Sequence, residues 1–107
     1  MQKVQLKKLR MSFREGVFAR DDWKCVFCHD LAVDAHHITD RTEMPNDGYV
    51  LENGVSLCGY HHQMAEQFHI TGGVWWFKGF HPDDIYIVIG SSHERAVEAS
   101  RKLDGCI

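Results

Sequence analysis

Residues 53–62 read Asn-Gly-Val-Ser-Leu-Cys-Gly-Tyr-His-His, and this stretch decides the fold. Within it, Val55-Ser56-Leu57 predicts a short strand. A helix is expected from about Gly59 until the glycine pair at 72–73, because paired glycines end helices. Cysteine and histidine stand where the two elements meet, and both are metal-binding residue types. The stretch therefore predicts a strand that runs directly into a helix at a metal site.

A second pair of metal-binding residues lies upstream of this stretch. Cys25-x2-Cys28 and Cys58-x2-His61 each contain two intervening residues, and 29 residues separate the pairs. This spacing lets each pair hold one edge of a tetrahedron, as in structural zinc sites of the Cys3His type. The alternative is three buried thiols and a surface histidine, but two paired clusters in so short a chain favour Zn²⁺. Cys106 is left over and is interpreted as a spectator thiol.

The composition is that of one small globular domain. The chain has 107 residues, of which 44% are hydrophobic and 25% are charged. These values exclude a disordered chain, a collagen-like repeat and a coiled coil. A membrane span is not expected, because the chain lacks a run of about 18 apolar residues. Without a visible secretory signal we expect a cytoplasmic protein, where reducing conditions favour cysteines as metal ligands over disulfides.

Charge is unevenly distributed along the chain, although the net charge is only −3. Residues 1–20 contain six basic residues and one acidic residue, whereas the remainder contains six basic and 14 acidic residues. We expect residues 1–12 to form a basic arm that contacts phosphates, although a solvated helix end explains the asymmetry equally well. The candidate nucleic-acid contacts are Lys7, Lys8, Arg10, Arg14 and, in a later loop, Arg41.

The remaining pattern predicts a small α+β domain over residues 13–107, with a motif core at 25–69 and a helical extension at 74–107. A capping box at Ser12–Glu15 predicts the start of the first helix. The aromatic run Trp75-Trp76-Phe77 is expected to cover the core rather than to stack on bases. The predicted elements are a helix over about 13–20, strands over 31–38 and 55–57, a loop over 39–54, and helices from 59, from 82 and over 92–103.

The spaced motifs resemble those of a known enzyme family. In order and spacing, Cys25-x2-Cys28, Ala35-His36-His37-Ile38 and Asn53-x3-Leu57-Cys58-x2-His61-His62 are similar to the core motif of HNH endonucleases. The resemblance spans about residues 13–69, and residues 80–86 resemble the segment after the motif in small phage-type members. The chain departs from the pattern at His61, where the family usually has a cysteine. The resemblance implies a ββα-metal fold and metal-dependent hydrolysis of phosphodiester bonds in DNA.

The resemblance also implies roles for individual residues. His37 would be the general base that takes a proton from water, and Asn53 would hold it in position. His36 and His62 would bind a catalytic divalent ion, which is Mg²⁺, Mn²⁺, Ni²⁺ or Zn²⁺. Neighbouring residues of a strand face opposite sides, so the roles of His36 and His37 are open to exchange on spacing alone.

Element geometry adds three candidates around this ion. Glu66 lies four residues after His62 on the same helix face, and a carboxylate there suits Mg²⁺ or Mn²⁺, although a solvated glutamate is equally favoured. Asp34 lies two residues before His36, so it either orients that ligand or is solvated, and we favour the solvated alternative. For His69 a surface or substrate-contacting position is favoured over a metal ligand.

These interpretations predict an HNH endonuclease that nicks or cuts DNA. The alternative is a non-catalytic zinc-binding module that binds DNA or another protein, and a metal-dependent RNase is a third hypothesis. The likeness to phage-type members further implies a setting in DNA packaging beside terminase and portal proteins, in a bacterial host cell and away from membranes.

Overall fold

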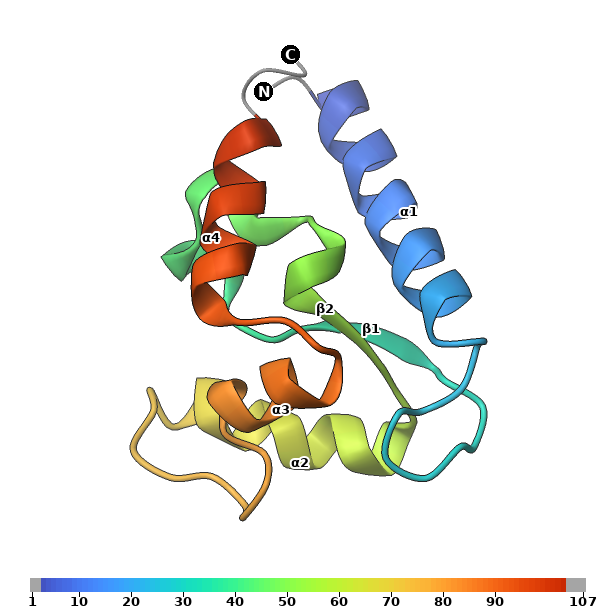
Figure 1. Ribbon diagram of the computed structural model, residues 1–107, viewed down its shortest axis with the longest axis vertical. Helices are drawn as coiled ribbons and strands as arrows, with labels where there is room; N and C mark the ends of the chain where they lie inside the picture. Colours follow the sequence, from blue (N-terminus) through green and yellow to red (C-terminus); the bar gives the residue numbers. More distant parts are fainter. Residues whose placement is uncertain (1–2, 104–107) are drawn as a thin grey trace.

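A two-stranded antiparallel sheet lies among helices in the computed structural model, which describes residues 3–103 (Figure 1). The strands are β1 (Asp34–His37) and β2 (Gly54–Leu57), and Asp34 pairs with Leu57 while His37 pairs with Gly54. The α-helices of the described range are α1 (Lys3–Arg20), α2 (Gly59–Ile70), α3 (Pro82–Val88) and α4 (His93–Arg101). The predicted α+β class is therefore confirmed.

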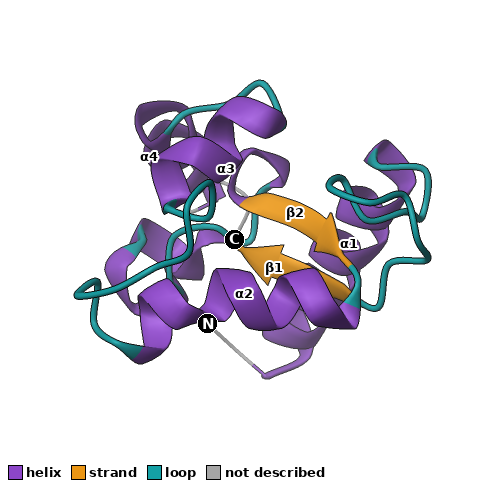
Figure 2. Cartoon of the chain, turned by 90° about the horizontal axis from the view of Figure 1, so that it is seen from below, coloured by secondary structure: helices purple, strands orange, loops and turns teal. Residues whose placement is uncertain are grey.

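The two faces of the sheet carry different helices, because side chains alternate along each strand. On one face, Ala35 packs against the apolar side of α1, and the Ser56 hydroxyl donates a hydrogen bond to the Val17 carbonyl of α1 at 3.2 Å. On the other face, Val55 and Leu57 pack with Ala65 of α2, which runs alongside the sheet (Figure 2). Each helix therefore presents side chains to its own face of the sheet.

Gly54 sets how closely α1 approaches β2. A Cβ atom at this position would lie 2.4 Å from Val17 Cγ2 and 2.8 Å from the Phe13 ring. No side chain fits there, so the missing Cβ is what lets Phe13 and Val17 rest directly on the strand. Both residues are almost completely buried.

The segment between the strands is compact rather than an open loop. It contains three short 3-10 turns, η1 (Arg41–Glu43), η2 (Pro45–Gly48) and η3 (Leu51–Asn53). α4 packs against this segment, where the Asn46 side chain donates a hydrogen bond to the Ser100 carbonyl at 3.0 Å. The segment predicted as a loop over 39–54 thus connects the two strands through short helical turns that α4 covers.

α1 begins earlier than the sequence pattern predicts. The prediction of a helix start near residue 13 is wrong, since one continuous helix runs from Lys3 to Arg20 through the supposed capping box. Leu6 and Leu9 pack against the same cluster as Phe13, and this extends the buried face toward the start of the helix. The described part of the expected basic arm is therefore the first half of α1.

β1 is shorter than predicted. Leu31 belongs to a separate bridge with Lys24, and regular pairing with β2 begins only at Asp34. Residues 31–33 instead connect the Cys25–Cys28 turn to the start of β1.

The aromatic run does not cover the core, contrary to expectation. Trp75 is 49% exposed, and Trp76 and Phe77 are each 39% exposed, in the loop between α2 and α3. The Trp76 ring packs at a tilt against Phe68 and edge-on against His81, and both partners are themselves only half-buried. The core beside this loop is already filled by Phe80, Ile85, Tyr86 and Ala96.

Within residues 3–103, none of the helices combines the length and the hydropathy that crossing a membrane requires.

Candidate functional site

Three sulfur atoms and one ring nitrogen meet where β2 runs into α2. The Sγ atoms of Cys28 and Cys58 are 3.7 Å apart, and His61 Nδ1 lies 3.5 Å from Cys25 Sγ and 3.2 Å from Cys58 Sγ. In a tetrahedron with Zn–S bonds of about 2.3 Å and a Zn–N bond of about 2.0 Å, the S–S and S–N edges are roughly 3.8 and 3.5 Å. The four predicted residues therefore come together in a group that can hold a metal ion such as Zn²⁺.

Backbone hydrogen bonds shape this Cys3His group. The His29 N–H donates to the Cys25 carbonyl at 2.9 Å, and His29 adopts a left-handed conformation with φ of 67° that turns the chain after Cys28. The Val26 N–H donates to the Ser56 carbonyl at 3.1 Å, which ties the turn to β2. The turn and the strand-to-helix junction are thus held together without a disulfide at Cys25, Cys28 or Cys58.

A second group of potential ligands lies between β1 and the middle of α2. His62 Nε2 is 3.1 Å from Asp34 Oδ2 and 3.2 Å from Glu66 Oε1, and the same Glu66 oxygen is 3.2 Å from His36 Nδ1. Ligand bonds of about 2.1 Å separate neighbouring ligands by roughly 3.0 Å in an octahedron and 3.4 Å in a tetrahedron. Asp34, His36 and His62 each offer one ligand atom within 4.8 Å of the others, a spacing that could hold a metal ion, and Glu66 contacts both histidines. These four residues are here named the carboxylate–histidine group.

Asp34 belongs to this group, whereas the sequence favoured a solvated carboxylate. Its side chain is 35% exposed, and its Oδ2 atom lies 3.1 Å from His62 Nε2. The sequence did indicate that Asp34 lies beside His36, because residues two positions apart in a strand share one face. Glu66 likewise contacts two histidines instead of projecting freely from α2.

The residues of this group shift the pKa values of one another. Hydrogen bonds from His36 and His62 hold the pKa of Glu66 well below its usual value. The hydrogen bond to Glu66 and the nearby Asp34 carboxylate raise the pKa of His62, whereas burial lowers the pKa of His36. His36 is 2% exposed, and its Nε2 is buried with no hydrogen-bond partner among the described residues.

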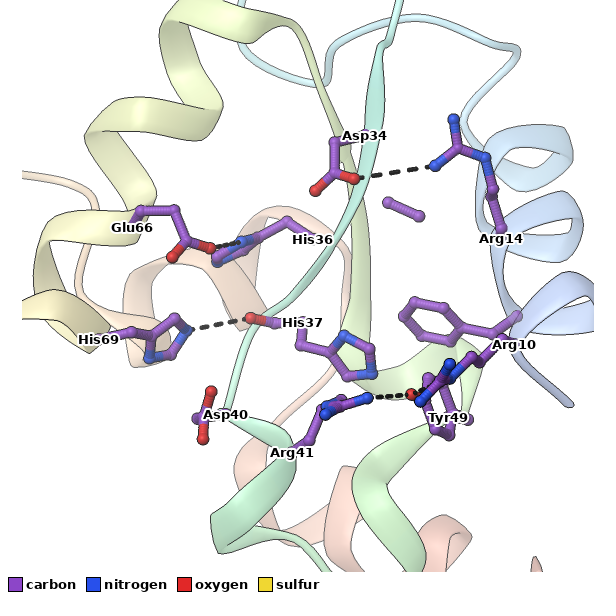
Figure 3. A pocket seen from close by; sticks show the side chains of 12 residues that line it. Arg10, Arg14, Asp34, His36, His37, Asp40, Arg41, Tyr49, Glu66 and His69 are labelled. Atoms are coloured by element: carbon purple, nitrogen blue, oxygen red, sulfur yellow. Dashed lines mark hydrogen bonds and ion pairs between the residues drawn. The ribbon is translucent and has the colours of Figure 1, made fainter. Parts of the chain in front are cut away.

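His36 and His37 project to opposite faces of β1. His36 points toward α2 and Glu66, whereas His37 points away from them (Figure 3). The ring of His37 stacks on Phe13 of α1 at a centroid distance of 4.5 Å. The two residues are thus not interchangeable in position. Only His36 reaches the carboxylates, and only His37 faces the side of the sheet that α1 covers.

The His37 ring is held by aromatic and backbone contacts. The Tyr49 ring meets it edge-on at 4.9 Å, and the His37 carbonyl lies 3.1 Å from His69 Nε2. Burial, with the nearby His36 and Arg41, lowers the pKa of His37 to about 4. The imidazole is therefore neutral near pH 7, the form that accepts a proton.

Asn53 is completely buried and acts on the segment after His37. Its Oδ1 accepts hydrogen bonds from the Thr39 N–H at 2.9 Å and from the Tyr86 hydroxyl at 2.7 Å. Its Nδ2 donates to the carbonyls of Thr39 at 3.1 Å and Gly48 at 3.3 Å. Asn53 makes no hydrogen bond to His37 itself among the described contacts, so it fixes the backbone two residues downstream.

A cavity of about 390 Å³ opens beside His37 (Figure 3). Its walls differ in charge, since Asp34, His36 and Glu66 line one part while three arginines line another. These arginines are Arg10 and Arg14 of α1 and Arg41 of η1. Of the predicted nucleic-acid contacts, Lys7 and Lys8 are exposed on α1 and do not line this cavity.

Tyr49 and Phe13 are site residues that the sequence did not single out as functional. Phe13 belongs to none of the metal-binding or catalytic motifs of the sequence, and it is the stacking partner of His37. Tyr49 lies within the segment between the strands and carries no motif, and its hydroxyl contacts Arg10, which is 39 positions away. No local signal in the sequence identifies a contact of that range.

Comparison of the chain with protein-family models, curated proteins and solved structures gives no significant match. The likeness to HNH endonucleases is therefore a resemblance between short motifs. Function is inferred from the residues that line the cavity and from their geometry.

Proposed function

We propose that the chain is a metal-dependent phosphodiester hydrolase of the HNH type that nicks or cuts DNA. The observation that carries this proposal is one cavity whose lining includes His37, three members of the carboxylate–histidine group and three arginines. The three members are Asp34, His36 and Glu66. A phosphodiester is an anion, and its hydrolysis needs an activated water and stabilisation of added negative charge. Each of these needs has a residue or a ligand group facing the same space.

The carboxylate–histidine group would hold the divalent ion. Its mixture of carboxylate oxygens and imidazole nitrogens suits Mg²⁺, Mn²⁺, Ni²⁺ or Zn²⁺ better than a soft metal that needs thiolates. When bound, such an ion supplies Lewis-acid stabilisation of the phosphate oxygens.

His37 is the proposed general base. Its Nε2 is buried without a partner among the described residues, which leaves Nδ1 as the ring nitrogen for a water in the cavity. A neutral imidazole can take a proton there, and the stacked Phe13 ring fixes the plane in which it does so. Asn53 supports the base indirectly, because it fixes Thr39 and hence the end of β1.

The arginines are proposed to bind the DNA backbone. Guanidinium groups donate hydrogen bonds to phosphate oxygens and are fully charged at neutral pH. Such contacts carry no base information, so we propose modest sequence preference. A role in phage DNA packaging, beside terminase and portal proteins, remains part of the proposal on the motif resemblance alone.

The Cys3His group is proposed to be structural. It joins the Cys25–Cys28 turn to the first turn of α2, which also carries His62. With Zn²⁺ bound there, the turn and the helix would be locked together, and metal binding would contribute directly to the folding free energy.

A supercoiled-plasmid assay tests the proposal. Zinc-loaded protein is incubated with plasmid and Mg²⁺, Mn²⁺, Ni²⁺ or no added divalent ion, and wild type is compared with His37→Ala. We expect metal-dependent conversion to open-circular or linear DNA that falls by at least about a hundredfold in the variant. His29→Asn is the matched control, because His29 is exposed and asparagine tolerates its left-handed backbone.

The same assay separates the alternatives. Zinc-loaded, folded wild type that binds DNA without cutting it under any metal would contradict the nuclease proposal and favour a non-catalytic binding module. Equal cleavage of a matched RNA would extend the substrate beyond DNA. Retained cleavage by His37→Ala would remove His37 from the role of base.

A further inference from the structure

Two guanidinium groups converge on the hydroxyl of Tyr49. Arg10 donates a hydrogen bond from Nε to the Tyr49 hydroxyl at 3.0 Å, and Arg41 donates from a terminal nitrogen to the same oxygen at 2.6 Å. Arg10 comes from α1 and Arg41 from η1, so the contact joins two separate elements (Figure 3). Tyr49 itself is only 6% exposed and its ring packs on Phe13, which fixes the hydroxyl in place.

Neither of these cations forms an ion pair with a carboxylate among the described residues, although the pKa of Arg41 is raised first by its hydrogen bond to Tyr49 and further by the nearby Asp47 and Asp40 carboxylates. Neither Arg10 nor Arg41 has a carboxylate oxygen within 4.0 Å among residues 3–103, whereas Arg14 lies 3.8 Å from Asp34. Two like charges drawn to one neutral oxygen repel each other. An anion placed between them would relieve that repulsion and would accept several charge-assisted hydrogen bonds.

The Tyr49 hydroxyl adds a donor of its own. Its oxygen already accepts from both arginines, and its proton has no acceptor among the described residues. A phenol hydroxyl can donate and accept at once, so this proton remains for a ligand. Arg10, Arg41 and Tyr49 all line the same cavity, so three side chains with donor groups border one space that a phosphate could enter.

We propose that Arg10, Arg41 and the Tyr49 hydroxyl form a phosphate clamp that holds a DNA phosphate adjacent to the one being cut. His37 lies between the clamp and the His36–Glu66 pair (Figure 3). The phosphate that is cut must lie with the carboxylate–histidine group, so an anion on the far side of His37 is a neighbouring one. Tyr49 acts as a positioning residue, since its oxygen keeps both guanidinium groups together. This inference rests on the proposed function for the identity of the ligand.

A binding experiment tests the clamp without any need for cleavage. Inorganic phosphate is titrated into zinc-loaded protein without added divalent ion, and the Nε–Hε signals of the arginines are followed by NMR. We expect the Arg10 and Arg41 signals to shift together, and the phosphate affinity of Tyr49→Phe to fall by about tenfold with the loss of the shared anchor. Tyr60→Phe is the matched control, because Tyr60 is 70% exposed on α2.

A cleavage experiment tests the position of the bound phosphate. Oligodeoxynucleotides carry one uncharged methylphosphonate at each position flanking the cut. We expect one flanking substitution to raise KM of wild type by about tenfold with little change in kcat, and to have no further effect on Tyr49→Phe. Arg101→Ala, which removes an exposed charge of α4, should keep the wild-type response.

Each outcome decides a different point. Phosphate binding that is unchanged in Tyr49→Phe, or independent losses from the methylphosphonate and from Tyr49→Phe, would overturn the clamp. Tyr49-dependent phosphate binding by a protein that cuts no nucleic acid would uphold the clamp and reject the nuclease proposal. A methylphosphonate effect only at the cut phosphate would reject the neighbouring position.

Discussion

The Asn53 side chain makes a two-point contact with the backbone of Thr39. Its Oδ1 accepts the Thr39 N–H at 2.9 Å, and its Nδ2 donates to the Thr39 carbonyl at 3.1 Å. The backbone of Asn53 adds a third bond, since its carbonyl accepts the Ile38 N–H at 2.9 Å. The residues directly after His37 are therefore anchored to the start of β2 through one buried amide.

Replacing Asn53 with alanine should destabilise the fold strongly. Truncation leaves the Thr39 amide, the Thr39 carbonyl and the Tyr86 hydroxyl with fewer partners in a buried place, so we expect the free energy of unfolding to fall by about 2–4 kcal/mol. Urea denaturation of both proteins measures this. Tyr86→Phe removes one bond to Asn53 and one to Thr39, and should cost about 1–2 kcal/mol. Equal losses for both variants would contradict the account.

Removal of the metal ion from the Cys3His group should unfold the chain around β2 and α2. We expect one zinc ion per chain by elemental analysis, and cooperative loss of structure in circular dichroism when a strong chelator removes it. Cys28→Ser should reproduce this loss, because a thiolate ligand is gone. Cys106→Ser, a thiol outside the described residues, should keep both the zinc and the fold. Full stability of the chelated protein would argue against a structural zinc.

Asp34→Asn tests whether the carboxylate–histidine group holds the divalent ion. We expect the affinity for Mn²⁺, measured by calorimetry on zinc-loaded protein, to fall by at least about tenfold, because a neutral amide is a weaker ligand than a carboxylate. Asp22→Asn is the control, since the Asp22 side chain is 90% exposed and belongs to neither ligand group. Unchanged Mn²⁺ affinity in Asp34→Asn would remove Asp34 from the ligand set.

Gly54→Ala should weaken the packing of α1 on the sheet. The new Cβ would meet Val17 Cγ2 at 2.4 Å, and relief of that clash requires α1 to shift, at an expected cost of about 1–3 kcal/mol. At Gly59 the nearest atom to an added Cβ, on Val33, is 4.0 Å away. Gly59→Ala should therefore leave the thermal midpoint unchanged or slightly raised. A destabilisation confined to Gly59→Ala would show that α1 does not rest on β2 as described.

Local patterns in the sequence predicted the elements whose signals are themselves local. The Cys-x2-Cys and Cys-x2-His spacings each span a single turn, so each pair of ligands could be predicted without knowledge of the rest of the fold. The strand-to-helix junction after Leu57 was equally clear, because the residues that end one element begin the next. The structure brings Cys25, Cys28, Cys58 and His61 together, as the two paired spacings predicted.

Features that depend on tertiary packing could not be predicted in this way. Ser12 and Glu15 form a valid capping signal, yet burial of Leu6 and Leu9 against the α1 side of the sheet outweighs it. The aromatic run at 75–77 resembles core material, and only the finished core shows that Phe80 and Tyr86 already fill the space. Local propensity is weaker than either effect.

The charge environment of the candidate site could not be predicted from the sequence either. Asp34 and Glu66 were each compatible with a solvated surface, because the sequence does not state which strand face meets which helix face. The contact between Tyr49 and Arg10 requires α1 to lie beside the segment between the strands. Such relationships arise only when elements distant in the chain are brought together.

His61 and His62 are consecutive residues of α2, yet one belongs to the Cys3His group and the other to the carboxylate–histidine group. Because they share one helical turn, a rotation that reorients one imidazole toward its ion also moves the other imidazole. Ions held at the two groups would therefore be thermodynamically linked, and each would change the affinity for the other by the same factor. The zinc supply of the cell would then act on the proposed hydrolytic site from a distance, although the two groups share no ligand.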